Sequence, residues 1–105
     1  MLKIYAVILQ LLSELRPVLA RVQRLDPDLA RQMRRACQSM VLNCAEGAYS
    51  QGGNKRVRYY NALGSARETL ACVEAGMALG YVEPLDAVTL DRFQHVIGTL
   101  VRLVK

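Results

Sequence analysis

Histidine and cysteine, the residues that most often bind metals or act as nucleophiles, are scarce in this chain. It has one histidine, His95, and three cysteines, Cys37, Cys44 and Cys72. An odd cysteine count without CxxC spacing argues against a secreted disulfide scaffold, and zinc would need about four recognisably spaced ligands. A single histidine supplies no nucleophile–base pair. We therefore expect no catalytic residue, metal or cofactor, and a non-enzyme in a reducing, cytoplasmic compartment.

Proline, glycine and long apolar runs are also few. The 105 residues include three prolines and seven glycines, and 52% of them are hydrophobic, so the chain is neither disordered nor low in complexity. No run approaches the ~18 apolar residues that span a bilayer. The apolar start, residues 1–9, is soon followed by Gln10 and Glu14 without a cleavage site. We expect a soluble protein with neither a signal peptide nor a membrane span.

Hydrophobic side chains recur at three- and four-residue steps, which predicts helices. We expect four, within one domain over 1–105, at about residues 2–24, 27–50, 55–79 and 84–104. Because the connections are short, consecutive helices must run antiparallel. The predicted fold class is all-α, an antiparallel up-down-up-down four-helix bundle.

Local signals predict where these helices begin and end. Asp26 and Pro27 suit the N-cap and the first position of the second helix. Asn54, after a Gly-rich break, is expected to cap the third helix, and Pro84 is expected to open the fourth. Gly80 suits a left-handed residue after the third helix.

The apolar stripes predict the core and one further contact. In the fourth segment the expected seam consists of Leu90, Phe93, Ile97, Leu100 and Val104. The first segment has a second stripe beside its core stripe, formed by Leu2, Tyr5, Leu9 and Leu12. One bundle seam needs less width than this, so we expect contact with another subunit as well as the core.

Two lines of polar side chains border the stripes of the second and third helices. They consist of Ser39, Asn43, Glu46 and Ser50 on the second helix, and of Asn61, Ser65 and Glu68 on the third. The lines can face one another and hydrogen-bond across the bundle. The carboxylates Glu46 and Glu68 also suit a metal or acid/base site, but di-metal bundles use Glu-x-x-His pairs, which one histidine cannot supply. We interpret both lines as structural.

Positive charge is concentrated toward the N-terminus. Residues 1–67 carry a net charge of +7 and residues 68–105 carry −2; eleven of the fourteen basic residues are Arg, which suits bidentate phosphate contacts. In an antiparallel pair, the end of the first helix and the start of the second form one patch, made of Arg21, Arg24, Arg31, Arg34 and Arg35. A polyanionic partner fits such a patch, and a solvated cationic surface is the alternative.

A second basic patch opens the third helix at the opposite end of the bundle. It consists of Lys55, Arg56 and Arg58. Tyr59 and Tyr60 follow directly, and aromatic side chains beside cations can stack on bases. We expect both patches to contact nucleic acid.

Three short motifs support a family resemblance. They are N-x-A-E-G at 43–47, G-S-x-x-E at 64–68 and L-G-Y at 79–81. In this order and separation, they resemble the four-helix-bundle proteins encoded in intervening sequences of bacterial 23S rRNA genes, over nearly the whole chain. That family is similar to the accessory variability determinant of diversity-generating retroelements, a bundle that binds nucleic acid and works with a reverse transcriptase.

The resemblance implies a ring-like homopentamer without enzymatic activity. It also implies that a structural motif fixes helix packing, formed by Asn43, Glu46, Gly47, Gly64, Ser65 and Glu68. Our leading hypothesis is a non-catalytic oligomer that binds structured RNA or single-stranded nucleic acid. The alternative is a protein-interaction scaffold that recruits a partner such as a retroelement reverse transcriptase.

Overall fold

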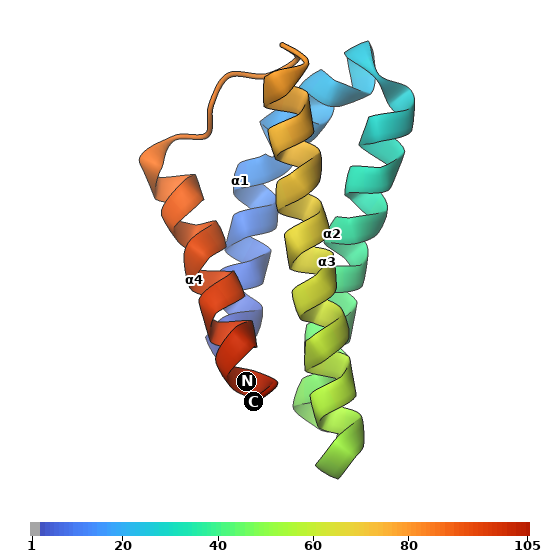
Figure 1. Ribbon diagram of the computed structural model, residues 1–105, viewed down its shortest axis with the longest axis vertical. Helices are drawn as coiled ribbons and strands as arrows, with labels where there is room; N and C mark the ends of the chain where they lie inside the picture. Colours follow the sequence, from blue (N-terminus) through green and yellow to red (C-terminus); the bar gives the residue numbers. More distant parts are fainter. Residues whose placement is uncertain (1–2) are drawn as a thin grey trace.

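Four helices form an antiparallel bundle in the computed structural model, which describes residues 3–105 (Figure 1). They are α1 (Lys3–Leu25), α2 (Pro27–Tyr49), α3 (Gly52–Ala78) and α4 (Ala87–Leu103). Each helix packs on its neighbours in the chain, and α4 closes the bundle against α1. The molecule measures 43 × 26 × 20 Å, and the α2–α3 connection extends beyond the end where both termini lie (Figure 1). The predicted all-α four-helix bundle is confirmed.

Two of the predicted helix boundaries are present as expected. The Asp26 carboxylate accepts a hydrogen bond from the Leu29 backbone N–H at 3.0 Å, and Pro27 begins α2. Gly80 has a φ of 79°, in the left-handed region where glycine is favoured. The Tyr81 N–H then bonds the Gly76 carbonyl at 2.8 Å, which completes a Schellman end to α3.

Two other boundary predictions are wrong. The third helix begins at Gly52, so Asn54 lies inside it, and the N-cap is Gln51 without a side-chain hydrogen bond. Gly52 has a φ of 61°, in the left-handed region where glycine is favoured, so the helix can begin at this residue. Pro84 does not open α4, because the Asp86 carboxylate accepts a 2.7 Å bond from the Thr89 N–H and starts the helix at Ala87. The predicted first helical residue, Leu2, lies outside the described residues.

The core runs along the bundle axis. Its largest fully buried side chains include Ile8, Leu11, Met33, Met40, Tyr59, Phe93 and Leu100. The α4 seam differs from the prediction, since Leu90 is 41% exposed, whereas Thr89 and Val96 are buried. The inward row therefore runs 89, 93, 96 and 100, and it begins with a threonine that a purely apolar pattern passes over.

The three cysteines are free and lie in or beside the core. Burial raises the pKa of both Cys37 and Cys44 to about 11, and it also raises the pKa of Cys72. Their thiols are therefore protonated at neutral pH. A buried, protonated thiol behaves as a small hydrophobic side chain.

A helix that crosses a membrane must be long and largely apolar. Over residues 3–105, no helix is both long and apolar enough to cross a bilayer.

Candidate functional site

The two predicted polar lines meet at the interface between α2 and α3. Ser65 donates from its hydroxyl to the Ser39 hydroxyl at 2.7 Å, and the Asn43 amide donates to the same Ser39 oxygen at 3.1 Å. Thr69, buried on the next turn, donates to the Ser65 carbonyl at 2.8 Å. This network joins the two helices where the N-x-A-E-G and G-S-x-x-E motifs lie.

Gly47 lets α2 approach α3 closely. A Cβ atom at this position would lie 2.7 Å from a ring carbon of Tyr59, closer than side chains normally pack. Gly64 is different, because it is exposed and an added Cβ would meet nothing within 4 Å. Close packing explains the glycine at 47 and leaves the one at 64 unexplained.

The same contact corrects a prediction about base stacking. Tyr59 is only 1% exposed, so its ring belongs to the core and cannot stack on a base. Its hydroxyl is buried and has no hydrogen-bond partner among the described residues. Tyr60 is 66% exposed and Tyr49, at the end of α2, is 89% exposed, so accessible aromatic rings remain at this end of the bundle.

Glu46 and Glu68 have different surroundings. Glu46 forms a 3.0 Å ion pair with Arg58, which also donates to Asn43 at 3.5 Å. Glu68 is exposed and lines a polar hollow between α2 and α3 together with Arg35. In the described part of the chain, no group of three or more acidic, histidine or cysteine side chains is placed to hold a metal ion.

Five arginines lie near the end of α1 and the start of α2, and we call this set the α1–α2 arginine patch. Its members are Arg21, Arg24, Arg31, Arg34 and Arg35. Arg31 pairs with Asp28 on its own helix, and Arg34 bonds Gln23 across the two helices. Within residues 3–105, Arg24 and Arg35 have neither an ion pair nor a side-chain hydrogen bond, and both are exposed. The patch is therefore only partly neutralised.

The second predicted patch is more strongly engaged by the protein itself. Arg56 donates from Nε to the Val104 carbonyl at 2.9 Å, which ties the start of α3 to the end of α4. Arg58 is held by Glu46 and Asn43. Lys55 is exposed and, among the described residues, forms no ion pair. Of these three residues, Arg56 and Arg58 therefore help to hold the helices together.

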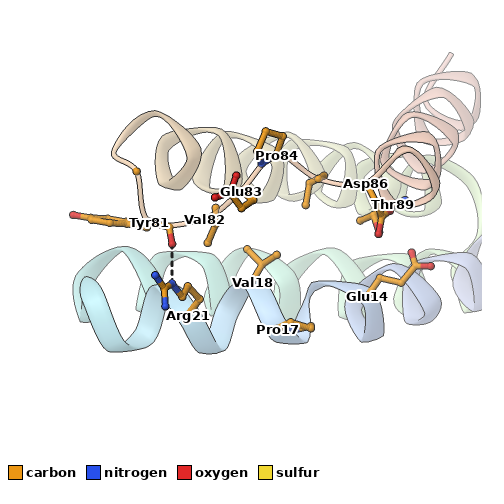
Figure 2. A pocket seen from close by; sticks show the side chains of 12 residues that line it. Glu14, Pro17, Val18, Arg21, Tyr81, Val82, Glu83, Pro84, Asp86 and Thr89 are labelled. Carbon is orange, nitrogen blue, oxygen red and sulfur yellow. Dashed lines mark hydrogen bonds between the residues drawn. The ribbon is translucent and has the colours of Figure 1, made fainter.

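Sequence reasoning missed a pocket of about 470 Å³ between α1 and the loop that joins α3 to α4 (Figure 2). Arg21 donates from Nε to the Tyr81 carbonyl at 3.1 Å, and the Tyr81 hydroxyl donates to Asp26 at the same distance. At the other end of the pocket, Glu14 accepts two bonds from Arg92, at 2.7 and 3.0 Å. The L-G-Y motif was the available signal, since its tyrosine anchors this loop.

These features define a class of protein, a small all-α bundle. Its helices α2 and α3 are joined by a serine network, and its α1–α2 arginine patch is only partly neutralised. The chain belongs to the 23S rRNA-intervening sequence protein family, whose sequence model matches residues 2–101. This confirms the family resemblance over nearly the whole chain. Neither a curated protein nor a solved structure matches it.

Proposed function

We propose that this protein is a non-catalytic, oligomeric bundle that binds structured RNA or single-stranded nucleic acid through the α1–α2 arginine patch. The observation that carries the proposal is that five arginines lie where α1 ends and α2 begins, a segment whose acidic residues are Asp26 and Asp28. Asp26 is already occupied by the Leu29 N–H and the Tyr81 hydroxyl. These donors are neutral and leave the Asp26 charge in place, but five arginines against two aspartates still give this segment a net positive charge.

The arginines that have internal partners still offer donors to a phosphate. A guanidinium has five N–H groups, and Arg21 uses only its Nε. The Arg31–Asp28 pair is solvent-exposed, with side-chain exposures of 59% and 83%, so solvent screens it and a phosphate can displace it at little cost. Arg24 and Arg35 need no displacement.

Oligomerisation would strengthen such a surface. A ring-like homopentamer, as the family resemblance implies, would repeat the patch around the assembly and make weak contacts multivalent. The apolar second stripe of α1 supports a subunit contact, since Leu9 is 43% exposed and Tyr5 and Leu12 are only partly buried. Leu2 of this stripe lies outside the described residues.

The test is a salt titration of binding to labelled structured RNA, single-stranded DNA and duplex DNA, with the oligomer mass measured on the same sample. We expect tight binding that weakens steeply as salt rises, because released counterions drive phosphate contacts. Reversing Arg31, Arg34 and Arg35 to Glu should abolish binding.

A matched triple reversal separates the patch from net charge. Arg67, Arg102 and Lys105 are exposed and lie outside the patch, and their change to Glu alters the total charge by the same amount. This control should retain most of the affinity. If both triple variants lose binding equally, the effect is general charge and the patch has no special role.

A second candidate function is favoured by exposed apolar side chains near the α2–α3 connection. Leu42, Tyr49, Val57 and Tyr60 are between 55% and 89% exposed. Such a surface suits a protein partner, for example a retroelement reverse transcriptase. A gene beside a reverse transcriptase, and co-purification with that enzyme that is lost in Leu42→Ser/Tyr60→Ser, would support this function. A gene inside an rRNA operon would favour the first.

A further inference from the structure

A polar hollow of about 430 Å³ lies between α2 and α3. It is lined by Gln32, Arg35, Ala36 and Ser39 of α2 and by Ser65 and Glu68 of α3. Its volume falls within the range of about 300–1,000 Å³ that is usual for ligand pockets. Because Arg35 also belongs to the α1–α2 arginine patch, the hollow adjoins the surface proposed to hold phosphates.

The charged groups of the hollow are free to bind a ligand. Arg35 offers only donors, and the ionised Glu68 offers only acceptors. They line the same hollow, yet neither forms an ion pair with any residue in the described range 3–105. A ligand with acceptors on one edge and donors on the next would satisfy both.

The floor of the hollow supplies a further donor. The Ser39 oxygen accepts hydrogen bonds from Ser65 and Asn43, which occupy both of its lone pairs. Its own proton has no partner among the described side chains and backbone groups. This serine is held in place by the network, so its hydroxyl is pre-oriented.

We propose that this hollow reads a guanine base of a single-stranded nucleic acid, an inference that rests on the proposed function. Guanine carries two neighbouring donors, N1–H and the N2 amine, and two acceptors, O6 and N7, on the adjoining edge. Glu68 matches the donor edge, and Arg35 with Gln32 matches the acceptor edge. Adenine, with an acceptor at N1, would face the Glu68 carboxylate with a repelling lone pair.

Unpaired segments are the nucleic acids whose bases can enter such a hollow. Their bases are splayed out and can be read on both edges, whereas duplex pairing occupies the Watson–Crick edge. The arginine patch beside the hollow would hold the flanking phosphates. The patch supplies affinity, and the hollow supplies the preference for one base.

The experiment measures binding of short uridine-tract RNAs that differ at one central position, by fluorescence anisotropy. We expect the guanine RNA to bind about tenfold more tightly than the adenine RNA, as one bidentate base contact provides. Inosine, which lacks the N2 amine, should give an intermediate affinity. Glu68→Gln should abolish the preference, because it replaces one acceptor of the carboxylate with a donor.

The matched control is Glu74→Gln, an exposed carboxylate of α3 outside the hollow. It removes the same charge and should keep the preference for guanine. Circular dichroism should show that both variants remain folded. A Glu74→Gln protein that also loses the preference would overturn the proposal, since the effect would then be one of charge.

The remaining outcomes separate this inference from the function on which it rests. Equal affinity for the guanine and adenine RNAs would overturn the guanine site while leaving nucleic-acid binding in place. Absence of binding to every RNA at low salt would overturn both.

Discussion

Replacing Gly47 by alanine tests the close approach of α2 to α3. The added Cβ would lie 2.7 and 2.9 Å from two ring carbons of Tyr59, which is 1% exposed and has little room to move. Overpacking of this kind costs about 1–3 kcal/mol. Alanine recovers at most about 1 kcal/mol of helix propensity. We therefore expect a net destabilisation of up to about 2 kcal/mol.

Gly64→Ala is the matched control, because this glycine lies inside α3 with nothing within 4 Å of an added Cβ. Without a clash, only the propensity gain remains, and the variant should be stabilised by about 0.5–1 kcal/mol. The two substitutions are chemically identical, so opposite signs isolate the contact with Tyr59.

Urea unfolding at one fixed protein concentration measures the effect, since oligomerisation makes apparent stability depend on concentration. In a parallel thermal unfolding experiment, each kcal/mol of stability should change the Tm by about 4–8 °C in a domain of this size. In a Tyr59→Leu background the penalty of Gly47→Ala should disappear. Equal stabilisation by alanine at both glycines would refute the argument, because the Tyr59 ring would then yield without cost.

Three further predictions concern buried or capped polar groups. Tyr59→Phe should raise the free energy of unfolding by about 1 kcal/mol, because it removes a buried hydroxyl that has no partner in the described structure. A loss of stability in urea would show instead that the hydroxyl forms a hydrogen bond. Hydrogen bonds from the backbone N–H and the side chain of Thr89 hold the pKa of Asp86 below its ordinary value of 3.8. The stabilisation from this cap is therefore complete above that pH and is lost as the pH falls through the lower folded value. Asp86→Asn should make acid unfolding shallower in this range, and an unchanged pH profile would contradict the cap. Burial raises the pKa values of Cys37 and Cys44 to about 11, so both thiols should react slowly with iodoacetamide at neutral pH and fast in denaturant. Mass spectrometry would follow the labelling. Rapid labelling of the native protein would contradict the burial.

Periodicity predicted the four helices well because inward positions recur at three- and four-residue steps. In the predicted seam of the fourth helix, Phe93 and Leu100 are buried as expected. It was less accurate at helix starts, where single hydrogen bonds decide between nearby residues. The fourth helix is capped by the Asp86 carboxylate and does not begin at Pro84, and the N-cap of the third helix is Gln51 and not Asn54. A cap depends on backbone geometry, which residue spacing does not encode.

The candidate site was only partly accessible to the sequence. The facing of Ser39 and Ser65 followed from helical spacing. The burial of Tyr59 did not, because a tyrosine next to three cations suggests a surface, and only the glycine on the opposite helix shows that its ring turns inward.

Gly47 and Tyr59, which pack together between α2 and α3, tolerate substitution less readily than the exposed surface does. These two residues are constrained by volume, so a larger side chain at position 47 would demand a smaller one at position 59. Arg24 and Arg35 bear no such constraint, because they are exposed and, within residues 3–105, form no ion pair or side-chain hydrogen bond. Substitutions at these two positions can therefore change the charge of the surface without disturbing the packing of α2 on α3.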